Sequence, residues 1–173
     1  METGLPSFTL YPIGYVKKEG PKTLLVLGEA YKDGLLGLKN FSHIYVYFWF
    51  DQNDTPDRRA TLQVHPMANP KNPLTGVFAT RSPRRPNLIG MTLSRILRVE
   101  DNIIEIEWTD ALENTPIIDI KPFIRTIDCT EDSKVPAWLE HNDWVKKPSK
   151  SMQERRPGAS EADKERSGLT LRG

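Results

Sequence analysis

Three arginines lie close together in residues 80–87, which read Thr-Arg-Ser-Pro-Arg-Arg-Pro-Asn. The two prolines restrict the backbone, and Asn87 can hydrogen-bond main-chain groups in a tight turn. A stiff segment loses little entropy when it binds a ligand, and the planar guanidinium group fits a phosphate or a carboxylate. The segment therefore predicts an anion-binding loop that carries Arg81, Arg84 and Arg85. The alternative is a surface turn whose arginines serve only solubility.

Positive charge extends to both sides of this segment. Residues 58–99 contain eight Lys and Arg side chains and no Asp or Glu, although the formal net charge of the chain is only +1. A local excess of this kind favours a polyanionic partner. A solvated basic surface is the plainer interpretation, but the preference for arginine over lysine favours phosphate recognition.

A second segment supplies carboxylates. Residues 110–116, Asp-Ala-Leu-Glu-Asn-Thr-Pro, follow a predicted strand, and Asp119 and Lys121 alternate on one face of the next strand. Such a connection offers carboxylates and free backbone groups to a cationic or hydroxyl-rich ligand. Taken alone, it is equally well an ordinary connection between strands.

Both segments need a framework, and the hydrophobic pattern predicts one made mainly of strands. Asp101 and Asn102 form a turn pair between two of them, a long loop is expected at 55–79, and Ser133 can begin a helix over 135–145. The fold class is therefore all-β: a small β-barrel of about seven strands, or else a sandwich, with short peripheral helices. The strands are expected at residues 8–16, 23–29, 41–51, 76–80, 89–99, 103–109 and 117–120.

Residues 44–50 form the most apolar of these strands, and they are apolar on both faces. A small barrel has only one interior to fill, so the outer aromatic side chains Tyr45, Tyr47 and Trp49 need another cover. A second copy of the chain would provide it, which predicts a homodimer. The C-terminal segment, with its two tryptophans, is the alternative cover.

Length and composition limit the possibilities further. The 173 residues suffice for one domain, expected over 1–148, and the polar tail over 149–173 is expected to be disordered. One cysteine, Cys129, and three scattered histidines provide no disulfide framework and no metal-ligand spacing. No apolar run reaches membrane-spanning length and the N-terminus does not resemble a secretory signal, so we expect a cytoplasmic protein without membrane attachment.

Several familiar motifs are missing from the sequence. It contains no Gly-x-Gly-x-x-Gly, no Walker lysine motif and no Ser nucleophile elbow. This argues against a doubly wound dehydrogenase or methyltransferase. Cys129 has no matching histidine near it in the sequence and is interpreted as a small buried residue rather than a nucleophile.

Three segments together resemble a known family. Residues 80–90 are similar to the Thr-Arg-Ser-Pro-x-Arg-Pro-Asn-Pro-Ile-Gly signature of the TsaA-like proteins, which include the TrmO tRNA methyltransferases. Residues 37–50 resemble that family's Gly-Leu-x-x-Phe-Ser-His-Ile strand, and residues 115–123 resemble its Thr-Pro-x-x-Asp-Ile-Lys-Pro-Tyr block. With Tyr-Pro-Ile-Gly at 11–14, the resemblance covers about residues 8–125.

The resemblance implies a small all-β barrel that works as a homodimer and binds S-adenosyl-L-methionine without a Rossmann fold. It also implies methylation of N6 of threonylcarbamoyladenosine beside the anticodon of threonine tRNA. Carried over by position, the cofactor contacts fall at Asp51, Gln52, Arg81, Leu93, Asp110, Ala111, Leu112 and Glu113. The anticodon stem-loop of the tRNA would face Arg84, Arg85 and Asn87, with Lys121 as a further cation.

The sequence departs from the family pattern at three places. Asp51 stands where the family often has His, Leu88 where it has Pro, and Glu113-Asn114 where it has Asp-Gly. Asn114 can adopt the left-handed conformation that glycine would supply, so we expect the turn to be retained.

A methyl transfer from a sulfonium is an in-line displacement, in which positioning supplies much of the acceleration. The expected target nitrogen carries a carbonyl substituent, so a base that removes its proton would help. Asp119 is the first candidate base and Asp110 the second; the alternative for Asp119 is a pair with Lys121 or a backbone amide. Arg81 fits the cofactor carboxylate. A non-catalytic RNA-binding barrel and a methyltransferase acting on a small molecule remain alternatives.

Overall fold

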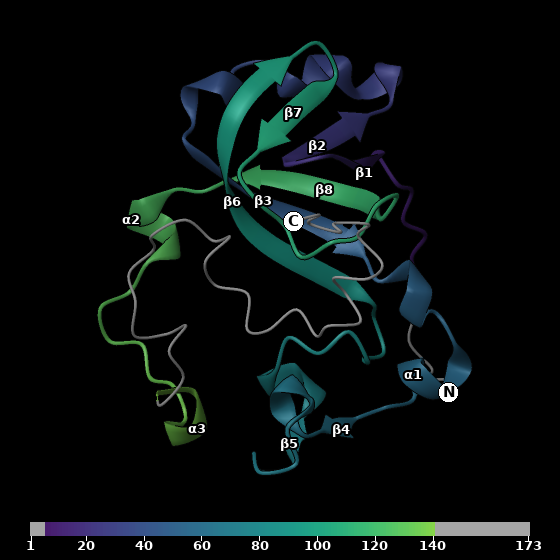
Figure 1. Ribbon diagram of the computed structural model, residues 1–173, viewed down its shortest axis with the longest axis vertical. Helices are drawn as coiled ribbons and strands as arrows, with labels where there is room; N and C mark the ends of the chain where they lie inside the picture. Colours follow the sequence, from purple (N-terminus) through teal and green to yellow (C-terminus); the bar gives the residue numbers. More distant parts are fainter. Residues whose placement is uncertain (1–5, 141–173) are drawn as a thin grey trace, which may run out of the picture. The chain divides into compact units, whose positions relative to one another are not determined.

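A computed structural model of the chain describes residues 6–140, and strands dominate this part (Figure 1). The chain divides into two units, residues 1–133 and 134–173. The strands of the described residues all belong to the first unit, and the described part of the second holds one short helix, α3 (Ala137–Glu140). The expected domain boundary at 148 and 149, the expected tail and the end of the expected helix over 135–145 lie outside the described residues.

Six antiparallel strands close into a barrel in the order β1-β2-β7-β6-β3-β8. The mainly β fold and the barrel are confirmed. Six strands line the barrel where about seven were expected, because the predicted strand at 76–80 does not join it. The barrel strands are β1 (Gly14–Glu19), β2 (Lys22–Leu27), β3 (His43–Trp49), β6 (Ile89–Glu100), β7 (Ile103–Ile106) and β8 (Pro116–Pro122).

Alternate side chains of these strands fill the barrel, as the pleat of a strand requires. Within β3, Ile44, Val46 and Phe48 are buried, and the residues between them face outward and are half-buried. The expected hairpin at Asp101 and Asn102 joins β6 to β7. The core consists of Val16, Leu25, Leu27, Ile44, Val46, Phe48, Ile104, Ile106, Ala111 and Ile117.

Gly90 allows β6 to pass close to the largest ring of this core. The residue pairs with Phe48 across the β3–β6 ladder, and a Cβ atom on it would lie 2.3 Å from a carbon of that ring. Real Cβ atoms do not approach other atoms so closely. The glycine that ends the arginine-rich motif is therefore a packing requirement of the barrel.

The strand expected at 8–16 begins only at Gly14. Phe8 and Tyr11 are 87% and 73% exposed, and the chain joins the barrel where the N–H of Ile13 bonds the Ile117 carbonyl. The apolar character of this segment suggested a strand, but no neighbouring strand pairs with it in the described part of the chain.

The strand expected at 76–80 shrinks to β5 (Thr75–Gly76), followed by a 3-10 turn, η5 (Val77–Ala79). Thr80 explains the bend, because its N–H and its hydroxyl both bond the Val77 carbonyl, at 3.2 and 3.0 Å. The local side-chain hydrogen bond competes with strand pairing here.

Residues 51–88 leave the barrel between β3 and β6. Figure 1 shows the small β4–β5 sheet of this excursion apart from the barrel, beyond the end where β3 finishes. The expected loop at 55–79 is therefore a chain of short elements. Within it lie α1 (Pro56–Arg59), β4 (Gln63–Val64), η4 (Pro66–Ala68), β5 and η5, and η3 (Asp51–Asn53) precedes it. Elsewhere lie η1 (Glu29–Leu35), η2 (Leu38–Asn40) and α2 (Arg125–Asp128).

Candidate functional site

The arginine loop, residues 80–87, leads from η5 into β6 and is shaped by two hydroxyl groups. Thr80 Oγ1 and Ser82 Oγ each accept the backbone N–H two residues further along, both at 3.2 Å. Leu88, at the end of the loop, is fully buried, and its carbonyl accepts the Phe50 N–H at 2.8 Å. The side chain expected to hydrogen-bond the backbone, Asn87, is exposed and makes no such bond within residues 6–140; the two hydroxyls take that role.

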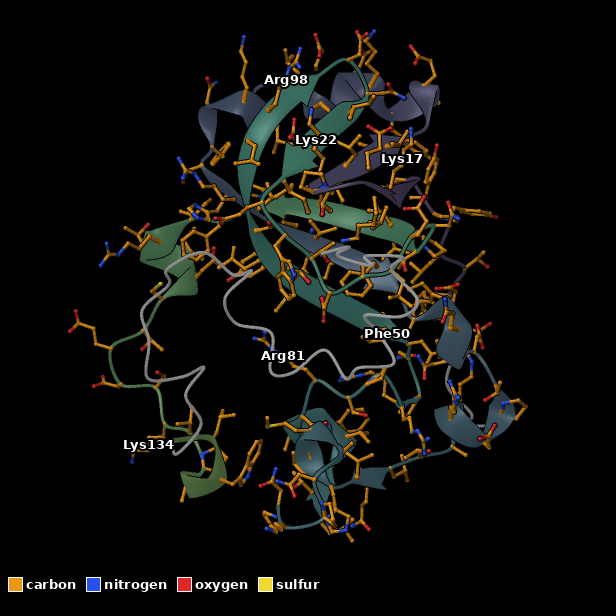
Figure 2. All side chains as sticks on the ribbon, viewed as in Figure 1. Lys17, Lys22, Phe50, Arg81, Arg98 and Lys134 are labelled. Atoms are coloured by element: carbon orange, nitrogen blue, oxygen red, sulfur yellow. The ribbon has the colours of Figure 1, made fainter. Side chains whose placement is uncertain are left out.

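The three arginines of the loop differ in their surroundings. Arg85 is half-buried, and its Nη1 lies 3.4 Å from the carbonyl oxygens of both Thr80 and Ser82, so it braces the loop itself. Arg81 and Arg84 are exposed, and their guanidinium groups have no hydrogen bond or ion pair to any described residue. Figure 2 shows Arg81 below the barrel, on the same side as Phe50 and away from Arg98. Arg81 and Arg84 are therefore the arginines of this loop that are available to a ligand.

The outer face of β3 carries aromatic side chains that pair with residues of β6 and β8. Burial raises the pKa of Tyr45 above its usual value, the nearby Asp128 carboxylate adds to that rise, and the positive charge of Arg81 opposes it. Tyr45 also packs edge-on against Phe123, with ring centroids 5.9 Å apart. Cross-strand rows on this face join Tyr45 to Leu93 and Lys121, and Tyr47 to Met91 and Asp119.

Asp119 is engaged on both of its carboxylate oxygens. Oδ2 lies 2.9 Å from Lys121 Nζ, and Oδ1 accepts the Ile120 N–H at 2.8 Å. The pair raises the pKa of Lys121, chiefly through the hydrogen bond. The alternative role for Asp119, a pair with Lys121 and a backbone amide, is the one that these contacts provide.

A relay of buried hydroxyls holds the turn at 109–113. The Ala111 N–H donates to Thr109 Oγ1 at 3.1 Å, and that hydroxyl donates to Thr92 Oγ1 at 3.2 Å. Thr92 Oγ1 then donates to Asp110 Oδ1 at 2.6 Å. Thr92 and Thr109 are 4% and 1% exposed, so this chain of bonds runs through the barrel interior and orients the exposed Asp110 carboxylate.

Strand β1 holds the other end of this turn. The Lys18 N–H donates to the Glu113 carboxylate, and Lys18 Nζ bonds the Thr109 carbonyl at 3.2 Å. Asn114 has φ +62°, the left-handed conformation expected of it, and its N–H bonds the Val16 carbonyl at 2.8 Å.

The cofactor residues expected from the resemblance occupy different settings. Ala111 is a core residue, whereas Leu112 is 55% exposed. Asp51 and Gln52 lie in the exposed turn η3 directly after β3. Within the described residues, no hydrogen bond or ion pair joins this turn to the 109–113 turn or to Arg81. Asp110 is tied to β6 through Thr92, the residue before Leu93.

Sequence reasoning missed two residues that support the site, Thr92 and Lys18. The signal for Thr92 was present, because the alternation of β6 places this polar residue at an inward position. Cys129 is exposed, so its interpretation as a buried residue is wrong; it follows the short helix α2, which lies outside the barrel wall. No group of three or more His, Cys, Asp and Glu side chains in the described residues could hold a metal ion. None of the described helices has the length and apolar character needed to span a bilayer.

Comparison with known proteins adds an independent finding. The family model of the tRNA-methyltransferase O N-terminal domain matches residues 10–129, which is more than half of the chain. A protein of Methanocaldococcus jannaschii, named as a probable S-adenosyl-L-methionine-binding protein, is 45% identical over 122 residues, 70% of this chain and 97% of its own. A similarly named protein of Pyrococcus horikoshii is 42% identical over 127 residues, 73% of this chain and 90% of its own.

Two further matches are longer than this chain. A mouse tRNA (adenine(37)-N6)-methyltransferase is 38% identical over 109 residues, 63% of this chain but 23% of its own length. A crystal structure of TrmO from Pseudomonas aeruginosa superposes with a TM-score of 0.61 at 27% identity, covering 79% of this chain and 64% of that protein.

Proposed function

Because the chain belongs to the family of the tRNA-methyltransferase O N-terminal domain, we propose that it methylates N6 of an adenosine in tRNA with S-adenosyl-L-methionine as the methyl donor. The observation that carries this proposal is the family match over residues 10–129, which includes the arginine loop, the 109–113 turn and the barrel between them. The finer proposal is that the adenosine carries a threonylcarbamoyl group and lies beside the anticodon of threonine tRNA.

The chemistry of the available side chains fits S-adenosyl-L-methionine. Arg81 offers an unpaired guanidinium to a carboxylate. The half-buried Leu93 and Tyr45 offer apolar surface to an adenine ring, and Asp110 offers a carboxylate to a cationic group. The chemistry that the cofactor supplies when bound is a methyl group on a positively charged sulfur.

Asp110 is the better placed of the two candidate bases. Both oxygens of Asp119 are already engaged within the protein, one by Lys121 Nζ and the other by the Ile120 N–H. Among the described residues, Asp110 accepts a hydrogen bond from one side chain, Thr92, which orients the carboxylate and leaves its second oxygen for a substrate N–H. We therefore propose that Asp110 takes the proton from the target nitrogen and that Asp119 acts by holding Lys121.

Two further proposals concern the assembly and its location. The outer aromatic face of β3, with Tyr45 and Tyr47 only half-buried, supports a homodimer through this face. Sedimentation of the purified full chain at several concentrations tests it, because a monomer at all concentrations would contradict it. A protein that modifies tRNA works where mature tRNA is found, so we propose a cytoplasmic location.

The direct test is methyl transfer with purified full-length protein, labelled S-adenosyl-L-methionine and tRNA from cells with and without threonylcarbamoyladenosine. Mass spectrometry of the nucleosides should show a methylated threonylcarbamoyladenosine only with the modified tRNA. Methylation of adenosine that lacks the threonylcarbamoyl group would support the methyltransferase activity but contradict threonylcarbamoyladenosine as the substrate. Binding of tRNA without binding of the cofactor in calorimetry would instead show a non-catalytic RNA-binding barrel.

A further inference from the structure

Arg59, the last residue of α1, connects the end of β3 to the arginine loop. Its Nε and Nη2 donate to the two oxygens of Asp54, at 2.6 and 2.9 Å. Its Nη1 donates to the Pro86 carbonyl at 3.3 Å. The guanidinium carbon also lies 5.3 Å from the ring centroid of Trp49. One side chain therefore contacts a strand end, a turn and the loop.

The geometry fixes this guanidinium more firmly than a surface ion pair does. The Asp54 carboxylate that binds it also accepts Trp49 Nε1, at 3.1 Å, so the three side chains form a closed triangle. Arg59 and Trp49 each lower the pKa of Asp54 below its usual value, with the Arg59 hydrogen bond the larger cause. A bidentate fork adds orientation as well as attraction, and the remaining N–H is left directed at Pro86.

Stability alone does not account for the arrangement. Exposed ion pairs contribute little, about 0–1 kcal/mol, and the side chains of Arg59 and Asp54 are 39% and 40% exposed. What the triangle does supply is a fixed donor for the Pro86 carbonyl. Pro86 cannot receive a brace through its own nitrogen, because proline has no N–H.

We propose that Arg59 is a positioning residue that holds the arginine loop in the conformation in which Arg84 is presented to RNA. The holding role stands on the contacts above, and the RNA role rests on the proposed function. The neighbouring Arg58 contacts η3 instead, where its Nη1 donates to the Gln52 carbonyl at 2.9 Å and to Asn53 Oδ1 at 2.8 Å. Two cations that the sequence assigned to a polyanion-binding surface are thus engaged in hydrogen bonds within the protein.

The loop-holding role is tested by limited trypsin cleavage of the native full chain. Trypsin can cut after Arg81 and Arg84, whereas the Arg85–Pro86 bond resists it. The variant Arg59→Lys keeps the charge but loses the fork, and it should raise cleavage at these two bonds about fivefold or more, because local opening sets the rate. Asp54→Asn should act in the same direction. Arg98→Lys, at the far end of β6, is the matched control and should leave cleavage unchanged.

The RNA role is tested with the same variants in steady-state methyl transfer. Arg59→Lys should raise the KM for tRNA about tenfold and leave kcat at saturating cofactor and tRNA within about twofold, because the variant changes loop presentation and not the chemical step. Wild-type cleavage rates in both variants would overturn the holding role. Faster cleavage with an unchanged KM would overturn the RNA role. If the wild-type chain bound no tRNA, the proposed function would fail, while the cleavage comparison would still decide whether Arg59 holds the loop.

Discussion

Individual side chains in the cationic stretch 58–99 divide into those that build the protein and those that are left for a ligand. Arg58, Arg59 and Arg85 bond backbone carbonyls, and Arg98 pairs with Glu100. The cations with no hydrogen bond or ion pair from their side chains to the described residues are Lys71, Arg81, Arg84 and Arg95. The excess of charge was predictable from the sequence. Its division was not, because it depends on which carbonyl oxygens the fold brings near each guanidinium.

Alanine substitutions of Arg81 and Arg84 should weaken the binding of different ligands. Arg81→Ala should weaken S-adenosyl-L-methionine binding about tenfold or more, since a charge-assisted fork to a carboxylate is lost. Arg84→Ala should leave cofactor binding within twofold and weaken tRNA binding instead. Calorimetry with the cofactor and filter binding with tRNA measure the two effects. Equal losses of cofactor affinity in both variants would contradict the division.

The two candidate bases are distinguished by conservative replacement. Asp110→Asn should lower kcat about a hundredfold or more, the usual contribution of a general base. Asp119→Asn keeps a polar side chain beside Lys121 and should lower kcat less than tenfold. Single-turnover methyl transfer from pH 5 to pH 9 measures both, with circular dichroism as a check of folding. A larger loss of kcat in Asp119→Asn than in Asp110→Asn would instead identify Asp119 as the general base.

The strands and turns were predictable where local pattern and tertiary pairing agree. The β6–β7 hairpin follows from Asp101-Asn102 between alternating apolar residues, and Asn114 adopts its expected left-handed turn. Residues 8–13 have a strand-like composition but no partner strand within the described residues. Thr80 bends the segment expected as a strand at 76–80, because its hydroxyl hydrogen-bonds the Val77 carbonyl. A single sequence carries no direct signal for either outcome, because pairing partners are distant in the chain.

Replacement of Gly90 tests whether the glycine at the end of the arginine-rich motif is required for packing of the barrel. Gly90→Ala should destabilise the protein by about 1–3 kcal/mol, the usual cost of forcing an extra methyl group into a packed core, because the new Cβ meets the Phe48 ring. Gly34→Ala is the matched control, since no atom lies within 4 Å of its added Cβ. Urea unfolding followed by tryptophan fluorescence measures both free energies. A Gly90→Ala variant as stable as the control would show that the strand shifts freely.

The assembled barrel explains why the candidate site was only partly predictable. The sequence motifs identified the arginine loop and the acidic turn, and the resemblance assigned them to one family, which the family match confirms. The supports of the acidic turn come from elsewhere in the chain: Thr92 from β6 and Lys18 from β1. Closure of the barrel brings these strands to the turn, and the hydrophobic pattern of a single strand does not specify which strands become neighbours.

The salt dependence of tRNA binding measures how many Lys and Arg side chains of the protein contact phosphates. Each neutralised phosphate of a single strand contributes about −0.7 to the slope of log K against log salt concentration. Three unpaired cations of residues 58–99 are not assigned to the cofactor: Lys71, Arg84 and Arg95. If all three contribute, their share of the slope for tRNA is about −2. Arg84→Ala should then reduce the steepness by about 0.7, whereas Arg98→Ala should not, because Arg98 is paired with Glu100. Filter binding at salt concentrations from about 50 to about 300 mM measures these slopes. A larger change with Arg98→Ala would place the RNA at the opposite end of β6 and remove the arginine loop from the tRNA-binding surface.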